Sequence, residues 1–286
     1  MSGLLQKFLV VGSVFGAAVL SFSPSQAASL GFYSVDIDTD ELVSIDVSTG
    51  AVRVIGGLGI DLNSIDLVIL NGKLYGVNNN FSPQEATLLQ IDTNTGIASS
   101  LGTLLRGTDQ VALVESVAAR DGKLFVGFTT TPRSPFSNRL GELQLDGTIV
   151  NDEYLGLRAD LDGLGASPSG VLFSTDGVPS IRTTFISTLE PLQSIGSYSS
   201  DDGGLINDLD FLGNELFGIS HDQDLLHRVD SLNGTLIDTV ALNRDGTYHG
   251  LATIPDNPVS TPEPSTLLGL GTLALAGGTL LRCRHR

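Results

Sequence analysis

Lys73-Leu74-Tyr75 is a short apolar strand signal that ends in an aromatic residue, and the same pattern occurs five times along the chain. The other copies are Gly31-Phe32-Tyr33, Lys123-Leu124-Phe125, Val171-Leu172-Phe173 and Glu215-Leu216-Phe217. From Tyr33 onward, the aromatic residues follow one another at intervals of 42, 50, 48 and 44 residues. A strand-rich repeat of this length is typical of four-stranded propeller blades. The period therefore predicts an all-β fold with five blades.

A second signal follows most of these strands, at a distance of about a dozen residues. It is clearest in Ile45 to Gly50, Ile91 to Gly96 and Val229 to Gly234, where an Asp follows an aliphatic residue and a Gly ends the segment. Asp and Gly in this order predict a tight hairpin after a strand. The third copy shortens to Leu145-Asp146-Gly147, and the fourth repeat lacks the signal.

A third signal precedes the aromatic strands and consists of one aliphatic residue among small ones, which suits strands crowded around an axis. Its copies are Ser64-Ile65-Asp66, Ser116-Val117-Ala118, Gly163-Leu164-Gly165, Asp208-Leu209-Asp210 and Gly250-Leu251-Ala252. The last copy has no aromatic strand after it, and the first aromatic strand has no such copy before it. We therefore expect a five-bladed β-propeller whose ring is closed by the C-terminal strand, which leaves no open sheet edge. A solenoid of the same period is the alternative, and it would need polar caps at its ends.

Both ends of the chain carry apolar segments. Near the N-terminus, Lys7 precedes an apolar stretch from Phe8 to Phe22, and small residues up to Ala27 form a cleavage signal, so we expect a signal peptide. A retained first transmembrane helix is the alternative. The run from Ser265 to Leu281 carries no charge, spans about 25 Å as a helix and precedes three arginines, which predicts a transmembrane helix with a cytoplasmic basic end.

The tail as a whole resembles a known sorting signal. Pro262-Glu263-Pro264, the apolar helix and the terminal basic cluster resemble, in this order, the PEP-CTERM signal of Gram-negative envelope proteins. The resemblance covers residues 261–286 and implies recognition by an exosortase, removal of the tail, and release or attachment at the cell surface. A plain tail anchor is the alternative. The rest of the chain resembles a secreted β-propeller.

The predicted organisation follows from these signals. We expect a signal peptide (1–27), a β-propeller (28–256), a linker with the PEP motif (257–264), a transmembrane helix (265–281) and a basic cytoplasmic tail (282–286). The mature protein is then exported through the inner membrane to the cell envelope, the cell surface or the medium, and the C-terminal helix holds it in the membrane before processing.

The predicted propeller is strongly acidic. Lys7, the three tail arginines and Glu263 lie outside it, which leaves 11 basic and 31 acidic residues and a net charge of −20. A surface of this charge excludes nucleic acid as a partner. The single cysteine, Cys283, belongs to the tail, so no disulfide stabilises the predicted propeller.

Two groups of residues are candidates for a binding site. The connections between the second and third strands of each blade are expected on one face, where aromatic, amide and basic side chains suit a polysaccharide or a surface protein. The candidate residues of this face are Asn78, Phe81, Arg133, Phe136 and His221. These loops can equally be solvated hairpin tips.

The second group consists of Asp66, Asp208 and Asp210, which fall on the segments expected to line the axis. Their charges repel one another unless a cation or water separates them, and calcium is the cation that carboxylate oxygens suit best. Hydrated channel residues without a bound ion are the alternative.

Signals for catalysis are absent from the sequence. The chain has no nucleophile elbow, no phosphate-binding loop and no histidine pair at metal-ligand spacing, and it contains no tryptophan. We therefore expect a non-catalytic binding or structural protein among exopolysaccharide. A glycan-acting hydrolase or lyase is the alternative, and it would place two carboxylates about 5–10 Å apart in an axial pocket. An inert spacer would show neither such a pocket nor a binding face.

Overall fold

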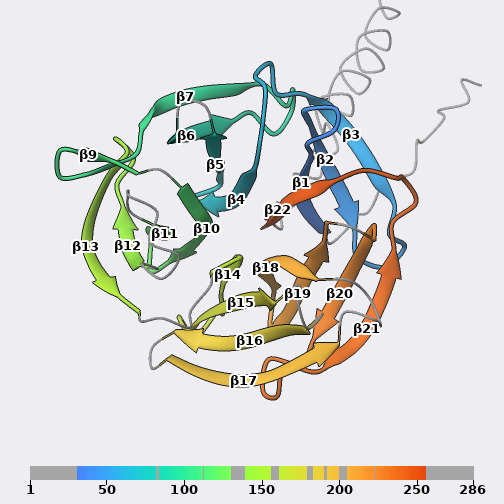
Figure 1. Ribbon diagram of the computed structural model, residues 1–286. Coiled ribbons are helices and arrows are strands. Elements are labelled where there is room, and N and C mark those ends of the chain that lie inside the picture. The colour runs from blue at the N-terminus through green and yellow to red at the C-terminus, as the bar shows by residue number, and fades with distance from the viewer. Residues whose placement is uncertain are drawn as a thin grey trace, which may run out of the picture.

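The computed structural model describes residues 31–81, 84–111, 113–129, 139–155, 161–178, 183–189, 192–199, 205–221 and 223–255. Within these ranges the regular elements are β-strands, which form five sheets arranged as a ring around a central axis (Figure 1). The predicted all-β, five-bladed propeller is thus confirmed. This part of the chain holds no helix that could cross a bilayer. The predicted signal peptide and the helix at 265–281 lie outside the described residues.

Each blade is a sheet whose strands follow one another from the axis outward. Blade 1 consists of β22 (Tyr248–Thr253), β1 (Gly31–Asp36), β2 (Glu41–Asp46) and β3 (Val52–Gly57). Blade 2 consists of β4 (Ile65–Leu70), β5 (Lys73–Phe81), β6 (Gln84–Ile91) and β7 (Ala98–Thr103). Blade 3 consists of β10 (Leu113–Arg120), β11 (Lys123–Thr129), β12 (Arg139–Leu143) and β13 (Thr148–Tyr154).

The last two blades follow the same order. Blade 4 consists of β14 (Gly163–Ala166), β15 (Leu172–Val178), β16 (Thr183–Leu189) and β17 (Leu192–Ser199). Blade 5 consists of β18 (Ile206–Leu212), β19 (Glu215–Ser220), β20 (Leu225–Val229) and β21 (Leu236–Ala241). The five aliphatic segments predicted near the axis all lie on the inner strands β4, β10, β14, β18 and β22.

The ring closes between the two ends of the described chain. The C-terminal strand β22 pairs antiparallel with β1, so that Phe32 lies opposite Thr253 and Asp36 lies opposite Tyr248. Beyond this register, the Ile254 N–H donates to the Gly31 carbonyl at 2.9 Å. Blade 1 is therefore built from both ends of the domain, as the unmatched repeat signals predicted.

The apolar core consists of five clusters, and each cluster lies between two neighbouring blades. Tyr248 and Phe217, for example, pack between blades 1 and 5, whereas Val77 and Phe128 pack between blades 2 and 3. Both faces of a blade are covered in this way. Apolar residues therefore occupy both faces of an inner strand such as β4, in place of a strict alternation with polar residues.

The Asp–Gly hairpins join neighbouring blades at the outer rim. In blade 1, Asp46 Oδ1 accepts hydrogen bonds from the Ser48 and Thr49 N–H groups at 2.9 and 3.1 Å, and Gly50 closes the turn with a φ of +68°. Gly50 then touches the outer strand of blade 5, because an added Cβ would lie 2.0 Å from the carbonyl oxygen of Ala241. Three further turn glycines touch the preceding blade in the same way: Gly96 at Gly56, Gly147 at Thr103 and Gly234 at Gly196.

A small hairpin between blades 2 and 3 has no counterpart in the repeat pattern. It consists of β8 (Leu105–Arg106) and β9 (Asp109–Gln110), and β8 pairs parallel with β13. Arg106 Nε lies 3.0 Å from Asp152 Oδ1, and Arg139 contacts the other oxygen of the same carboxylate. The hairpin thus extends the sheet of blade 3 at the rim.

Candidate functional site

The axis of the ring has two chemically different ends. Asp36, the last residue of β1, lies opposite Tyr248, the first residue of β22, so the loop that follows β1 adjoins the start of the inner strand. We call the face where the inner strands start the loop face, because it carries the connections between second and third strands. The chain enters β1 and leaves β22 at the opposite face.

A pocket of about 180 Å³ opens at the axis on the loop face, and we call it the polar mouth. Its polar lining residues are Ser64, Asp66, Asn79, Glu115, Asp162, Asn207, Asp208, His221 and His249. Four of these side chains are carboxylic acids and two are imidazoles. No lysine or arginine is among the residues that the structure places in this lining. The polar mouth therefore carries an excess of acidic groups.

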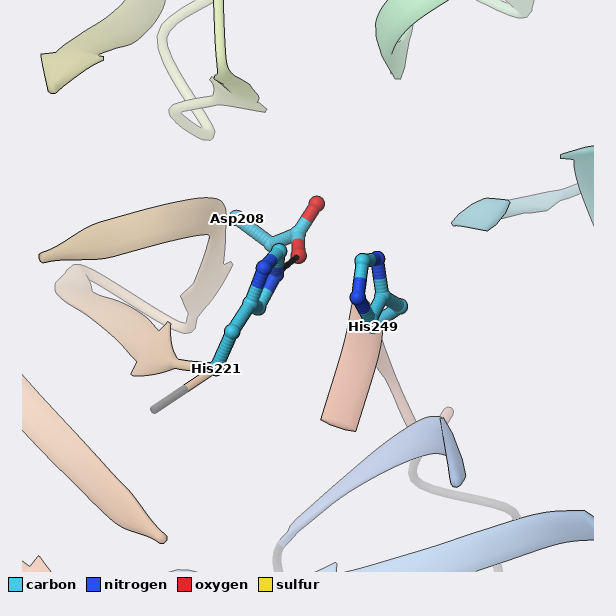
Figure 2. A group of neighbouring side chains, drawn as sticks. All are labelled: Asp208, His221 and His249. Carbon is cyan, nitrogen blue, oxygen red and sulfur yellow. Dashed lines mark hydrogen bonds and ion pairs between the residues drawn. The ribbon is translucent and has the colours of Figure 1, made fainter. Parts of the chain in front are cut away.

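Three side chains of the polar mouth point toward one another, as Figure 2 shows. Asp208 lies on β18, His221 follows the last residue of β19, and His249 is the second residue of β22. His221 Nε2 lies 2.8 Å from Asp208 Oδ2, and the rings of His221 and His249 are stacked with centroids 3.8 Å apart. One ligand atom from each of the three residues lies within 4.8 Å of the other two. Blades 5 and 1 thus build this group together.

Asp66 lies beside this group on the inner strand of blade 2. Its carboxylate oxygens accept hydrogen bonds from the Leu67 N–H at 2.7 Å and from the Val117 N–H at 2.5 Å. The pKa of Asp66 lies well above its ordinary value, because burial disfavours the charged form and the neighbouring charge of Asp208 adds repulsion. The two carboxyl groups therefore disfavour a state in which both are charged.

His249 is held by its neighbours in a neutral state. Burial and the nearby His221 lower its pKa to about 4, although Asp208 and Asp38 act in the opposite direction. Its backbone carbonyl accepts a hydrogen bond from Ser34 Oγ at 3.1 Å across the closing strand pair. At neutral pH the ring offers one nitrogen lone pair to a ligand.

Asp210 lies at the other end of the axis. It lines a second pocket of about 260 Å³ whose remaining wall is mostly apolar. Its Oδ2 accepts hydrogen bonds from the N–H and the hydroxyl of Thr253 at 2.7 and 2.8 Å, and its Oδ1 accepts one from the Phe211 N–H at 2.8 Å. Burial raises the pKa of Asp210 to about 6 although these hydrogen bonds lower it.

One physical reason accounts for all three axial aspartates. An inner strand is the edge of its sheet, so some of its N–H groups have no partner in the ladder. Asp66 on β4 accepts from Val117 on β10, and Asp208 on β18 accepts from the Gly250 N–H on β22 at 3.1 Å. Asp210 accepts from Thr253 on β22. Each carboxylate thus joins its own inner strand to that of the next blade.

The raised pKa of Asp210 predicts a pH-dependent cost to folding. Between the ordinary pKa of 3.8 and about 6, the folded state binds more protons than the unfolded state, so ionisation of Asp210 lowers stability as the pH rises through this window. Asp210→Asn removes this ionisation, although the NH2 group of the amide cannot accept a hydrogen bond as a carboxyl oxygen does. We therefore expect the stability of the variant relative to the native chain to rise between pH 4 and pH 7. A rise in pKa from 3.8 to about 6 corresponds to about 3 kcal/mol. The difference in stability should not exceed this value, because Asp210 is only partly buried.

Urea unfolding at a series of pH values measures this difference, and Asp238→Asn on the exposed outer strand β21 is the control. A difference between variant and native chain that does not change with pH would show that Asp210 is not buried enough to resist ionisation.

The structure groups the predicted site residues differently from the sequence. His221 and Asp208, predicted for different sites, are bonded to each other, and Asp66 adjoins them, whereas Asp210 lies at the other end of the axis. Of the other candidates for the loop face, Asn78 is 9% exposed and therefore mostly buried, whereas Phe81 is 48% exposed. Arg133, Phe136 and the motif Pro262-Glu263-Pro264 lie outside the described residues.

Sequence reasoning missed His249, Glu115 and Asp162 as members of the site. His249 directly precedes Gly250-Leu251-Ala252, the segment that was predicted to line the axis and to close the ring. This neighbouring position in the sequence was the signal that could have placed His249 next to the axis. Glu115 similarly precedes the axial segment that begins at Ser116.

The chain matches no known family profile and no curated protein. In fold it is similar to a protein of unknown function from Bacteroides caccae, with 11% identity, a TM-score of 0.44 and coverage of 76% of this chain and 74% of that one. It is also similar to the PQQ-bound aldose sugar dehydrogenase of Streptomyces coelicolor, with 12% identity, a TM-score of 0.49 and coverage of 79% and 82%. A chain of a nidogen/laminin complex has 12% identity, a TM-score of 0.48 and coverage of 79% and 98%. At such identities the likeness concerns the path of the chain and not its ligand or activity.

Proposed function

We propose that the chain is an exported cell-surface protein that binds a ligand at the polar mouth without converting it. The observation that supports this proposal best is the contrast between the two ends of the axis. Carboxylic acids and imidazoles from several blades gather on the loop face, whereas the opposite end is mostly apolar. Surface loops without such a site would not require Asp208, His221 and His249 to converge from two blades.

The direction of the chain supports a role at a surface. The Ile254 N–H donates to the Gly31 carbonyl, so both ends of the described domain lie at the face opposite the polar mouth. A domain attached through its C-terminal segment would therefore present the polar mouth away from the point of attachment. This arrangement suits a protein that meets its ligand outside the cell.

The sorting route is part of the proposal and depends on the tail sequence. We infer that an exosortase recognises Pro262-Glu263-Pro264 and removes the tail once the chain has crossed the inner membrane. The product then resides at the cell surface or in the extracellular matrix. The acidic propeller suits a well-solvated location among exopolysaccharide.

The size of the polar mouth limits what it can hold. Small-molecule sites usually enclose about 300–1,000 Å³, and the polar mouth encloses about 180 Å³. It can take an ion together with one functional group of a larger molecule, such as the end of a polysaccharide or a side chain of a surface protein. The rest of such a ligand would extend over the loop face.

A glycan-acting enzyme is the second candidate, because Asp66 and Asp208 bring two interacting carboxyl groups into an axial pocket. Glycoside hydrolysis uses a pair of carboxyl groups, one as a general acid and the other as a base or nucleophile. Both groups also bond to backbone N–H groups that hold the inner strands together. We therefore prefer the binding role.

Fractionation of cells that produce the chain together with exosortase and exopolysaccharide tests these proposals. We expect the native chain in the polysaccharide fraction and at the mass of a chain without its tail. His221→Ala should be processed equally but shift to the medium, and Asp238→Asn on the exposed outer strand β21 serves as the control. Replacement of Pro262, Glu263 and Pro264 by alanine should leave the full-length chain in the inner membrane.

Each outcome has a distinct meaning. Equal retention of the native chain and His221→Ala would contradict binding through the polar mouth. Processing that continues without the motif would contradict the sorting route. Release of new reducing ends by the native chain, abolished in Asp208→Asn, would favour the enzyme over the binding protein.

A further inference from the structure

We propose that Asp208, His221 and His249 bind a divalent transition metal, with Zn²⁺ as the reference ion, at the polar mouth. This metal site would be part of the proposed binding function. It rests on that function only because both place the ligand in the polar mouth. Metal binding is measured with the metal alone, so its failure can be distinguished from a failure to bind polysaccharide.

The geometry is close to that of a metal site. The three ligand atoms lie within 4.8 Å of one another. Tetrahedral coordination at about 2.1 Å places ligand atoms about 3.4 Å apart. The separations exceed this value by at most about 1.4 Å, so small side-chain rotations bring the group into this arrangement. The His221 side chain is 22% exposed and follows a strand end, so it has room to move.

The donor set selects the class of metal. Two imidazoles and one carboxylate are typical ligands of zinc and other first-row transition metals. Calcium instead takes six to eight oxygen ligands. The acidic set Asp66, Asp208 and Asp210 that predicted calcium is not assembled, since Asp210 bonds to Thr253 at the other end of the axis. Three protein ligands leave a coordination position for an external group.

The surroundings of the group favour a cation. Asp66, Glu115 and Asp162 line the same pocket as Asp208, and no basic side chain is among the lining residues that the structure describes, apart from the two histidines. A divalent ion would offset the repulsion between Asp66 and Asp208. The Gly250 N–H fixes Asp208 Oδ2 at 3.1 Å, so the carboxylate is already oriented.

Binding should also strengthen the closure of the ring. His249 belongs to β22 of blade 1, whereas Asp208 and His221 belong to blade 5. A metal held by all three would join the blades that carry the two ends of the domain. An ion that binds only the folded state raises the unfolding temperature.

Calorimetric titration of the full-length protein with ZnCl₂ tests the inference. The protein should carry Cys283→Ser and His285→Gln, because these tail residues could bind zinc themselves, and detergent keeps the tail soluble. We expect one zinc per chain and a rise in the unfolding temperature of roughly 5–10 °C when zinc exceeds its dissociation constant 100-fold. His221→Gln and His249→Gln should each weaken binding by about 100-fold or more, whereas Asp238→Asn should leave it unchanged.

Circular dichroism and Co²⁺ absorption distinguish a defined metal site from non-specific metal binding. Circular dichroism confirms that the glutamine variants fold, and His221→Gln is the safer of the two because its side chain is partly exposed. Co²⁺ in place of Zn²⁺ should give visible absorption that the variants lose. No heat of binding, a zinc affinity in both histidine variants equal to that of the parent protein, or calcium bound more tightly than zinc would overturn the proposal.

Discussion

Gly50→Ala is expected to destabilise the propeller by about 3 kcal/mol or more, whereas Gly72→Ala should cost only about 1 kcal/mol. Both glycines have a positive φ, +68° and +75°, so an alanine is strained by the backbone at either position. Their surroundings differ. A Cβ at Gly50 would lie 2.0 Å from the Ala241 carbonyl oxygen, but a Cβ at Gly72 would have no atom within 4 Å.

The additional loss at Gly50 measures the contact between blades 1 and 5. The Asn243 N–H donates to the Gly50 carbonyl at 3.0 Å, and Asn243 Oδ1 accepts from the Val52 N–H at 2.8 Å. Separation of the blades to admit a methyl group would also weaken these bonds. The backbone fixes the position of the Cβ, and its neighbour is a backbone oxygen, so no rotamer change can relieve the collision.

Thermal unfolding and urea titration of both variants measure the difference. We expect Gly50→Ala to unfold roughly 6–12 °C below the native chain, and Gly72→Ala roughly 2–4 °C below it. Similar losses for the two variants would show that the turn conformation alone, and not the contact between blades, accounts for the glycine.

Tyr248→Ala is expected to cost about 3–5 kcal/mol, in the range observed for large aromatic side chains removed from a core. Tyr248 begins the closing strand β22, is 0% exposed and packs with Phe32 and Phe217 between blades 1 and 5. Its hydroxyl donates to the Arg244 carbonyl at 2.8 Å. The substitution therefore leaves a cavity at the point where the ring closes.

Two further variants separate the causes of this loss. Tyr248→Phe keeps the ring and removes one hydrogen bond, so we expect a cost of about 1 kcal/mol. Tyr154→Ala, at a position that is 50% exposed, should stay within about 0.5 kcal/mol of the native chain. Urea unfolding gives all three values. A loss for Tyr248→Ala below that of Tyr248→Phe would mean that the closing strand contributes little to the core.

The number of blades and the closure of the ring could be predicted because each repeat carries local signals. The aromatic strand, the Asp–Gly turn and the small-residue segment mark the second strand, the outer hairpin and the inner strand of a blade. The hairpin β8–β9 could not be predicted, because its pairing with β13 joins Leu105 to Thr148 across more than one strand and leaves no periodic pattern. The contact of Gly50 with Ala241 at the rim could not be predicted either, because a turn motif does not indicate which neighbouring strand it packs against.

The candidate site was predicted only in fragments. Asp208 and His221 meet because the hairpin of β18 and β19 pairs Ile206 with Ser220, with a bulge between Ile206 and Asp208. A bulge shifts the register by one residue and is not visible in the sequence pattern. His249 joins them only once the ring is closed. Asp210 does not belong to the group, because its carboxylate is hydrogen-bonded to the N–H and the hydroxyl of Thr253 on β22.

The pairing of β1 with β22 has a mechanical consequence. Gly31 and Ile254 lie at the same end of an antiparallel pair, so a pull on the two chain ends loads the outermost hydrogen bond first and opens the pair one bond at a time. A load applied at His249 and resisted at Thr253 instead runs along the covalent backbone of β22 and does not pull β22 away from β1. The domain therefore withstands tension between its loop face and its C-terminal connection better than tension between its two ends.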